Sequence, residues 1–210
     1  MKKHQKSPLP SFTPEEQLER RIVFITQNGL SKKDLLSLND KLYKLCQENT
    51  EPIFIFFETN GGNVKAGYQM YRLILEEYRE KYNVVIVGVA WGRVDSIGAL
   101  VFQACTIRIM YEPGSSLYFH LISAKSKPIT AETDLKALFE EQKKEKETLQ
   151  LPQEQMYGFF LNASTKKISK DCLRELFRMD TRIPPLPAIE LGFADKVIYE
   201  CDFNNLTAIL

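Results

Sequence analysis

The chain has 210 residues, of which 44% are hydrophobic and 26% charged, a balance that allows one globular domain to bury a full core. Its 28 lysines and arginines are matched by 27 aspartates and glutamates, and a net charge of +1 gives no electrostatic basis for binding nucleic acid. The four cysteines lie far apart without a Cys-x-x-Cys pair, and only two histidines are present, which argues against a metal site and predicts reduced thiols.

The first 18 residues are expected to form an arm that ends in a short helix. In Thr13-Pro14-Glu15-Glu16 a capping hydroxyl is followed by proline at the first helical position and by glutamate at the third. No apolar stretch follows the N-terminal lysines, so we expect no secretory signal. The longest apolar runs, residues 53–57 and 84–91, are too short to cross a bilayer. These features predict a cytoplasmic protein with no membrane contact.

The folded body is expected over residues 19–200, followed by a tail at 201–210. Short β-branched or aromatic runs predict strands at residues 21–26, 52–58, 84–89, 106–111, 116–120 and 196–199. Most of these runs are continuously apolar, as in a sheet that is covered on both faces. Helical spacing at residues 31–45 and 64–79 separates the first three strands, with Ser31 and Asp34 at the start of the first helix. Strands that alternate with helices predict an α/β layer fold with right-handed crossovers.

Residues 131–149 predict a helix of a different kind. It begins amphipathic and becomes polar on every side from Glu140 to Glu147, so it cannot lie flat on a core along its whole length. One interpretation is a solvated surface helix with glutamate and lysine pairs three or four residues apart. The other is an arm that leaves the domain and packs against another subunit.

Ser96 is the candidate nucleophile, because it stands where an apolar run gives way to a small-residue helix start, Ile97-Gly98-Ala99-Leu100. A serine in this place is also typical of a plain helix cap. The first amides of a buried helix favour a developing negative charge, and the Ile97 N–H would be one oxyanion donor. Val94 stands at the first glycine position of a Gly-x-Ser-x-Gly elbow, which disfavours the α/β-hydrolase fold.

A serine nucleophile needs a base, and histidine is the commonest base near neutral pH. His4 lies in the arm, so His120 is the only histidine of the folded body. The alternative for His120 is a core histidine that is satisfied by a backbone carbonyl. Composition does not select the residue that would orient it among eight aspartates. Asp95 is a poor choice because it adjoins Ser96 and would project in another direction.

A second oxyanion donor is suggested by Gly61-Gly62, directly after a predicted strand and before a predicted helix. Glycine permits positive φ and lets backbone approach a ligand closely, although a Gly-Gly pair also makes ordinary turns. The carboxyl end of a strand is where α/β sheets place their ligands.

In this order the motifs resemble those of the proteolytic subunit of Clp protease (ClpP). Residues 60–67, Asn-Gly-Gly-Asn-Val-Lys-Ala-Gly, resemble the family's Ser-Pro-Gly-Gly-x-x-x-Ala-Gly segment, and residues 96–99 resemble its Ser-Met-Gly-Ala segment. Tyr118-Phe119-His120 falls where the family has its catalytic histidine, and residues 188–198 look like its Ala-x-x-Tyr-Gly-Leu-Ile-Asp-x-Val segment. The resemblance covers about residues 19–199.

The resemblance implies a catalytic triad and an oxyanion hole. Ser96 would attack the peptide carbonyl, and His120 would take and return the proton. Counting back from Gly192 without a gap puts Asp180 on the family's triad aspartate. The amides of Gly62 and Ile97 would receive the oxyanion.

The resemblance also implies a fold and an assembly. The fold would be the ClpP/crotonase α/β fold of repeated β-β-α units with a projecting handle helix, here about residues 130–163, which Pro152 is expected to interrupt. The implied activity is that of a serine endopeptidase that cleaves unfolded polypeptides inside a homo-oligomeric chamber of stacked rings, in protein quality control. The chain lacks a Gly-x-x-x-x-Gly-Lys-Ser/Thr loop, so ATP would be used by a separate AAA+ unfoldase, and no cofactor or metal is expected in the chain itself.

Three departures from the family pattern leave other functions open. Asp95 replaces an alanine beside the nucleophile, and residues 123–128 have no glycine where the family docks an extended peptide. Residues 181–187, after Asp180, contain three prolines, which are expected to stiffen the chain and remove backbone donors. One alternative is therefore a catalytically weak or inactive ring subunit with a regulatory or structural role. Another is a crotonase-type acyl-thioester enzyme, which also uses paired amides but does not need a serine and histidine pair.

Overall fold

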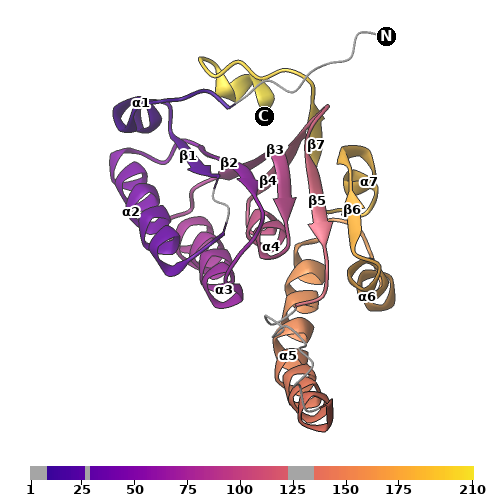
Figure 1. The fold of residues 1–210 in the computed structure, drawn as a ribbon. Coiled ribbons are helices and arrows are strands. Elements are labelled where there is room, and N and C mark those ends of the chain that lie inside the picture. Colours follow the sequence, from indigo (N-terminus) through magenta and orange to yellow (C-terminus); the bar gives the residue numbers. More distant parts are fainter. Residues whose placement is uncertain (1–8, 27–28, 123–134) are drawn as a thin grey trace.

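The computed structural model describes residues 9–26, 29–122 and 135–210 (Figure 1). The start of the expected arm, residues 1–8, and the glycine-poor stretch at 123–128 lie outside the described residues. Within these ranges no helix is both long and apolar enough to cross a bilayer. The architecture is a mixed α/β fold around a mainly parallel sheet, as the alternation of strands and helices predicts.

Five parallel strands form the body of the sheet in the order β1-β2-β3-β4-β7. Their bounds are β1 Ile22–Ile25, β2 Ile53–Thr59, β3 Ile86–Asp95, β4 Ile107–Tyr111 and β7 Lys196–Ile198. The first half of β3 pairs with β4, and its last three residues pair with β5 (Ser116–Phe119) instead. β6 (Thr181–Ile183) pairs antiparallel with β5 alone. β3 therefore serves two neighbours in succession, and its carboxyl end lies beside β5.

Helices α2 (Lys32–Glu48), α3 (Val64–Arg72) and α4 (Ile97–Gln103) pack on one face of the sheet (Figure 1). A capping box at Ser31 and Asp34 begins α2, and another at Thr13 and Glu16 begins α1 (Pro14–Glu19), as their sequences predict. The predicted helix at residues 64–79 continues beyond α3 as a π-helix, Leu73–Lys81. The main hydrophobic core lies between these helices and the sheet.

The opposite face of the sheet is covered by segments from both ends of the described chain. Phe203 packs on Phe56 and Trp91, with ring centroids 5.1 and 5.4 Å apart, and on Phe12 at 5.7 Å. Arg20 holds the Phe203 segment in place, because its Nη1 donates to the Phe203 carbonyl at 2.9 Å. The 3₁₀ helix at Leu206–Ile209 buries its first and last residues in the same cluster. A second, aromatic core results.

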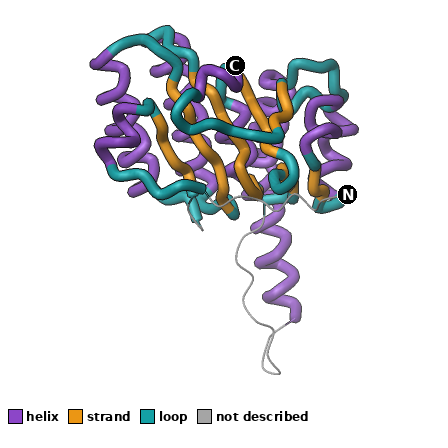
Figure 2. Tube along the Cα trace, turned by 90° about the horizontal axis from the view of Figure 1, so that it is seen from above, coloured by secondary structure: helices purple, strands orange, loops and turns teal. Residues whose placement is uncertain are grey.

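Helix α5 (Leu135–Ala163) projects from the body of the molecule (Figures 1 and 2). Pro152 lies inside this helix, so the expected interruption at Pro152 is wrong. The carboxyl-terminal part of α5 packs on the domain, where Met156, Tyr157 and Phe160 are buried. The helix is therefore anchored at one end and extends away from the body at the other.

The segment after α5 contains elements that the sequence did not predict: α6 (Lys170–Arg178), β6 and α7 (Pro185–Glu190). Pro184 is the N-cap of α7, and Pro185 and Pro187 lie in its first turn. The first-turn N–H groups of a helix have no intrahelical acceptor, so proline loses nothing there. The three missing donors that the sequence indicates therefore fall at the start of a helix, where no intrahelical bond needs them.

Candidate active site

Ser96 connects the end of β3 to the start of α4 in a strained backbone conformation. Its φ of 58° and ψ of −130° lie outside the regions that a residue with a side chain ordinarily adopts. Such strain amounts to about 1–3 kcal/mol and concentrates at functional sites. Although Ser96 stands at the N-cap position, its hydroxyl makes no capping hydrogen bond to α4. A plain helix cap therefore does not describe this serine.

The paired glycines lie against this turn. A Cβ placed on Gly61 would stand 2.8 Å from Ser96 Cβ and 3.4 Å from Ile97 N. Gly61 has a φ of 88° and Gly62 a φ of 144°, which side-chain-bearing residues rarely adopt. A short parallel bridge uses the Gly61 carbonyl, which accepts from Leu30 N at 2.6 Å. Within the described residues, neither the Gly62 N–H nor the Ile97 N–H has an acceptor. Both predicted oxyanion donors thus remain available beside Ser96.

The sheet register brings His120 beside the serine. β3 pairs with β5 up to Asp95 and Tyr118, and Ser96 N donates to the Tyr118 carbonyl at 2.8 Å. His120 follows the last residue of β5, and alternation puts it on the same face of the strand as Tyr118. The two rings stack with centroids 5.5 Å apart. The imidazole therefore lies just beyond β5, the strand whose Tyr118 carbonyl accepts from Ser96 N.

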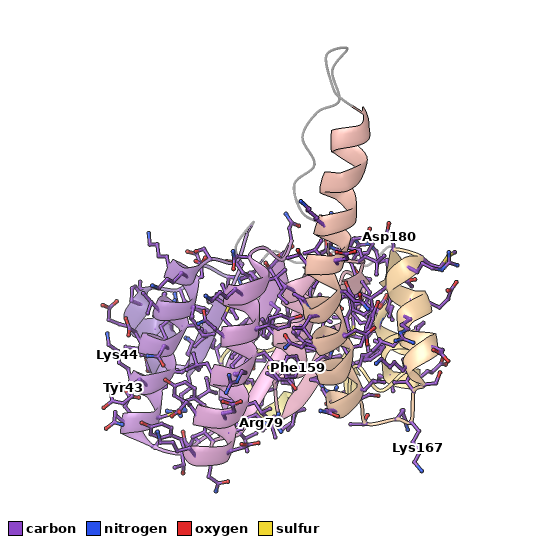
Figure 3. The ribbon with its side chains drawn as sticks, turned by 90° about the horizontal axis from the view of Figure 1, so that it is seen from below. Tyr43, Lys44, Arg79, Phe159, Lys167 and Asp180 are labelled. Carbon is purple, nitrogen blue, oxygen red and sulfur yellow. The ribbon has the colours of Figure 1, made fainter. Side chains whose placement is uncertain are left out.

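Asp180 comes to the same edge from the other side. The antiparallel ladder of β5 with β6 ends at the pair Phe119 and Thr181. Extended by one residue on each strand, the same register would set His120 opposite Asp180. Neighbouring strands lie about 4.8 Å apart. Asp180 is exposed, has a φ of 48°, and lies close to the point where α5 leaves the body (Figure 3). Two of the four non-glycine residues with positive φ in the described chain are thus predicted triad members.

The three side chains are not joined by hydrogen bonds. Among the described residues, none links Ser96 Oγ to His120, or His120 to Asp180. Catalytic hydrogen bonds in substrate-free enzymes are often long and tighten when substrate binds. The fold places the three residues at the ends of three neighbouring strands, and side-chain movement is needed to complete the chain of hydrogen bonds.

A charged cluster beside the serine was missed from the sequence. The Asp95 carboxylate is buried and accepts hydrogen bonds from Arg93 Nη2 at 2.5 Å and from Arg182 Nη1 at 3.1 Å. Arg182 Nη1 also donates to Ser116 Oγ at 2.9 Å. The only signal in the sequence was Asp95 itself, at a position where alanine was expected. Its partner Arg182 is 87 residues away, so no local pattern indicated the pair.

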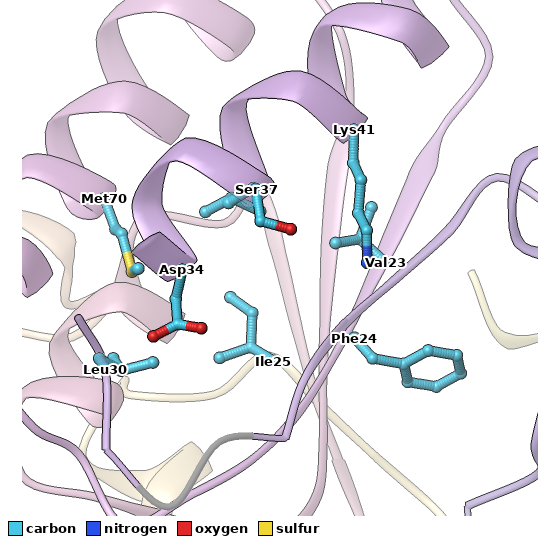
Figure 4. Close-up of a pocket in the computed structure, with 9 residues that line it drawn as sticks. Val23, Phe24, Ile25, Leu30, Asp34, Ser37, Lys41 and Met70 are labelled. Carbon is cyan, nitrogen blue, oxygen red and sulfur yellow. The ribbon is translucent and has the colours of Figure 1, made fainter. Parts of the chain in front are cut away.

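Neither a metal cluster nor the cavity drawn in Figure 4 competes with this site in the described part of the chain. No group of three or more histidine, cysteine, aspartate or glutamate residues there is arranged to hold a metal ion. A small cavity between β1 and α2 has a volume of about 30 Å³ and is lined by Leu30, Asp34 and Met70 among others (Figure 4). It has room for only a water molecule or two. Ser31 N and Oγ already donate to the Asp34 carboxylate at its wall.

The family model described as Clp protease matches residues 11–200. The chain belongs to the Clp protease family. A curated member of that family, the ATP-dependent Clp protease proteolytic subunit of Lactococcus lactis subsp. cremoris (strain SK11), is 25% identical over 186 residues, which make up 86% of this chain and 84% of that protein. The membership that the ordered motifs predict is confirmed.

The Clp protease fold is also found in a solved structure of a ClpP1 mutant from Listeria monocytogenes. The match has a TM-score of 0.71 and covers 90% of this chain and 97% of that one, at 18% sequence identity. At this identity the likeness establishes the fold alone. The predicted ClpP-like fold is therefore confirmed, and membership of the Clp protease family favours a proteolytic subunit over an acyl-thioester enzyme.

Proposed function

We propose that this chain is an active serine endopeptidase, with Ser96 as nucleophile, His120 as general base and Asp180 as the residue that orients the imidazole. The observation that carries the proposal is the strained turn at Ser96. It lies beside two N–H groups that have no acceptor among the described residues, and next to the strand that His120 follows. A structural serine has no need of positive φ, and the strain it stores requires support from the surrounding fold.

The reaction follows from this arrangement. Ser96 Oγ attacks the carbonyl carbon of the peptide bond while His120 takes its proton. The negative charge that forms on the carbonyl oxygen is stabilised by the N–H groups of Gly62 and Ile97. The C–N bond then breaks, His120 gives the proton to the departing amine, and an acyl-enzyme remains. Water, activated by His120, hydrolyses the acyl-enzyme and restores Ser96.

The working form is proposed to be a homo-oligomer of stacked rings in the cytoplasm, with α5 as a contact between copies. A separate AAA+ unfoldase would use ATP to deliver unfolded polypeptides. The projection of α5 from the domain supports this assembly, because a helix that leaves its own core is suited to packing against another copy. A sample that is strictly monomeric by light scattering at micromolar concentration would contradict it.

The second candidate is an inactive or weakly active ring subunit. The observation in its favour is that no hydrogen bond connects the three predicted triad residues in the described structure, with Asp180 exposed to solvent. Such a chain would keep the fold and the assembly without turnover.

Labelling with a fluorophosphonate probe separates the two candidates, because the probe forms a covalent bond with an activated serine. The active enzyme predicts labelling of the wild type and of the control Ser37→Ala, whose serine is exposed on α2, and no labelling of Ser96→Ala. His120→Ala should label much more slowly. Equal labelling of Ser96→Ala, or none of an assembled wild-type sample, would remove the endopeptidase proposal.

A further inference from the structure

Three charged or aromatic residues form a row across β3, β5 and β6. Asp95 pairs with Tyr118 in the β3–β5 ladder, and Tyr118 pairs with Arg182 in the β5–β6 ladder. The Arg182 side chain crosses the Tyr118 ring, with its guanidinium carbon 4.7 Å from the ring centroid, and reaches the Asp95 carboxylate. The side chain thereby ties the outermost of the three strands to β3 across the strand between them.

Continuing the same face by two residues reaches two of the three proposed triad residues, His120 and Asp180. His120 lies two residues after Tyr118, and Asp180 lies two residues before Arg182. Side chains two residues apart along a strand share one face of the sheet. His120 also stacks on the Tyr118 ring that Arg182 covers. The Arg182 to Asp95 ion pair is therefore one step away from the proposed pairing of His120 with Asp180.

Besides the burial of Ile183, few contacts of β6 fix its register. It comprises three residues and pairs only with β5, so few backbone hydrogen bonds fix it, each worth about 1 kcal/mol. A slip of one residue would turn every side chain of β6 to the opposite face. Asp180 precedes this strand in a left-handed conformation, so its place depends on where the strand begins.

The Asp95 carboxylate, through its ion pair with Arg182, connects β6 to a buried group of β3. Its side chain is 5% exposed, and a buried carboxylate requires charged or hydrogen-bonding partners. Arg93 and Arg182 supply them, with side chains 60% and 40% exposed. Arg93 belongs to the same strand as Asp95 and so ties nothing to β6. Of the two arginines, only Arg182 joins separate strands.

We propose that Arg182 is a positioning residue, whose ion pair with Asp95 fixes β6 across β5 and so holds Asp180 opposite His120. The inference rests on the proposed function, since it assigns Arg182 a role in the same triad. Arg182 acts through Asp180 and does not touch the reacting atoms.

The test compares matched arginine variants by the kinetics of hydrolysis of a short fluorogenic peptide. Arg182→Ala should lower kcat about 10- to 100-fold with little change in KM, because a small misplacement of a catalytic group has effects of this size. Arg93→Ala removes the other partner of Asp95 and should change kcat by less than about threefold. Arg182→Lys, which keeps the charge, should recover most of the activity.

A second background shows whether Arg182 acts through Asp180. In Asp180→Asn, the further change Arg182→Ala should produce no additional loss, because the group that it positions is already gone. If the loss on Arg182→Ala is as large in Asp180→Asn as in the wild type, or if Arg93→Ala is equally damaging, the inference is overturned.

Amide hydrogen exchange provides a readout without catalysis. Arg182→Ala should speed exchange in peptides that cover residues 179–184 about tenfold, while Arg93→Ala leaves them as in the wild type. Unchanged protection in Arg182→Ala would overturn the inference even in an active enzyme. If the wild type is not labelled at Ser96, the proposed function fails, and exchange alone then decides whether Arg182 fixes β6.

Discussion

Gly61 lies in direct contact with Ser96: a Cβ added at position 61 would stand 2.8 Å from Ser96 Cβ and 2.8 Å from the Asp95 carbonyl oxygen. Real Cβ atoms do not approach backbone atoms this closely, so any side chain here would displace the turn. The contact sets how near the segment after β2 comes to the start of α4, and thereby where the proposed oxyanion donors stand relative to the serine.

Gly61→Ala is expected to slow fluorophosphonate labelling of Ser96 strongly and to lower the free energy of unfolding by about 1–2 kcal/mol, because both the contact and the φ of 88° oppose a Cβ. The control is Gly158→Ala in α5, where an added Cβ meets nothing within 4 Å. That variant should label normally and gain up to about 1 kcal/mol of stability. Labelling of Gly61→Ala at the wild-type rate would contradict the proposed geometry.

Ser96→Gly is expected to be more stable than Ser96→Ala by about 1 kcal/mol, because glycine adopts positive φ without the strain that alanine would retain. Neither variant should be labelled by the probe. Chemical denaturation of both proteins measures the difference. Equal stability would mean that the serine turn stores little strain.

The elements that depend on short patterns of neighbouring residues could be predicted from the sequence. Hydroxyl and carboxylate spacing located the starts of α1 and α2, and apolar runs located all strands except β6. β6 was missed because Thr-Arg-Ile is too short to display a period of two before the proline-rich turn. α7 was not predicted because the effect of a proline depends on whether it falls inside a helix or in its first turn.

The candidate site could be predicted only in part for a similar reason. Ser96 and His120 stood out by composition and position, whereas Asp180 was singled out among eight aspartates only by resemblance to the family. The ion pair of Asp95 with Arg182 depends on a register across three strands. Patterns among residues that are close in sequence do not indicate which residues this register brings together.

Arg108 connects four separate segments, and its loss should destabilise the whole domain. Its guanidinium donates to the Asp195 carboxylate at 2.7 and 3.0 Å, to Gln103 Oε1 at 2.6 Å, and to the carbonyls of Ala163 and Gly192 at 3.0 Å. Arg108→Ala removes the ion pair with Asp195 and takes the guanidinium donor away from the buried Gln103 side chain, so we expect the free energy of unfolding to fall by about 3 kcal/mol.

Arg72→Ala is the matched control for Arg108→Ala. Arg72 pairs with Glu76 one helical turn away, and both side chains are exposed. An exposed pair of this kind contributes less than about 1 kcal/mol. If the two variants unfold at the same denaturant concentration, Arg108 is not the structural link that its contacts indicate.

Cys105 should resist alkylation in the folded protein, while the exposed Cys172 should react. Burial raises the pKa of the Cys105 thiol to about 12, so almost no thiolate is present at pH 8.5. Mass spectrometry after brief iodoacetamide treatment measures both sites, with Cys172→Ser as the control. Equal modification of Cys105 and Cys172 would show that the core around Cys105 opens readily.

The raised pKa of Cys105 also predicts how stability depends on pH. An unfolded chain ionises this thiol at about pH 8.5, whereas the folded protein retains the proton up to about pH 12. The stability that comes from keeping the Cys105 thiol protonated is therefore fully present below the unfolded pKa. It is lost as the pH rises from the unfolded pKa toward the folded one. The free energy of unfolding should fall more steeply with pH above 9 in the wild type than in Cys105→Ala.

The aromatic cover formed by Phe203 has a consequence for how the protein is made. Because translation runs from the N-terminus, Phe56 and Trp91 leave the ribosome long before the segment that shields them. A nascent or truncated chain that stops before residue 203 presents a bare aromatic surface, which favours self-association over completion of the fold. Premature termination should thus yield insoluble material even when every residue of the proposed triad has been synthesised.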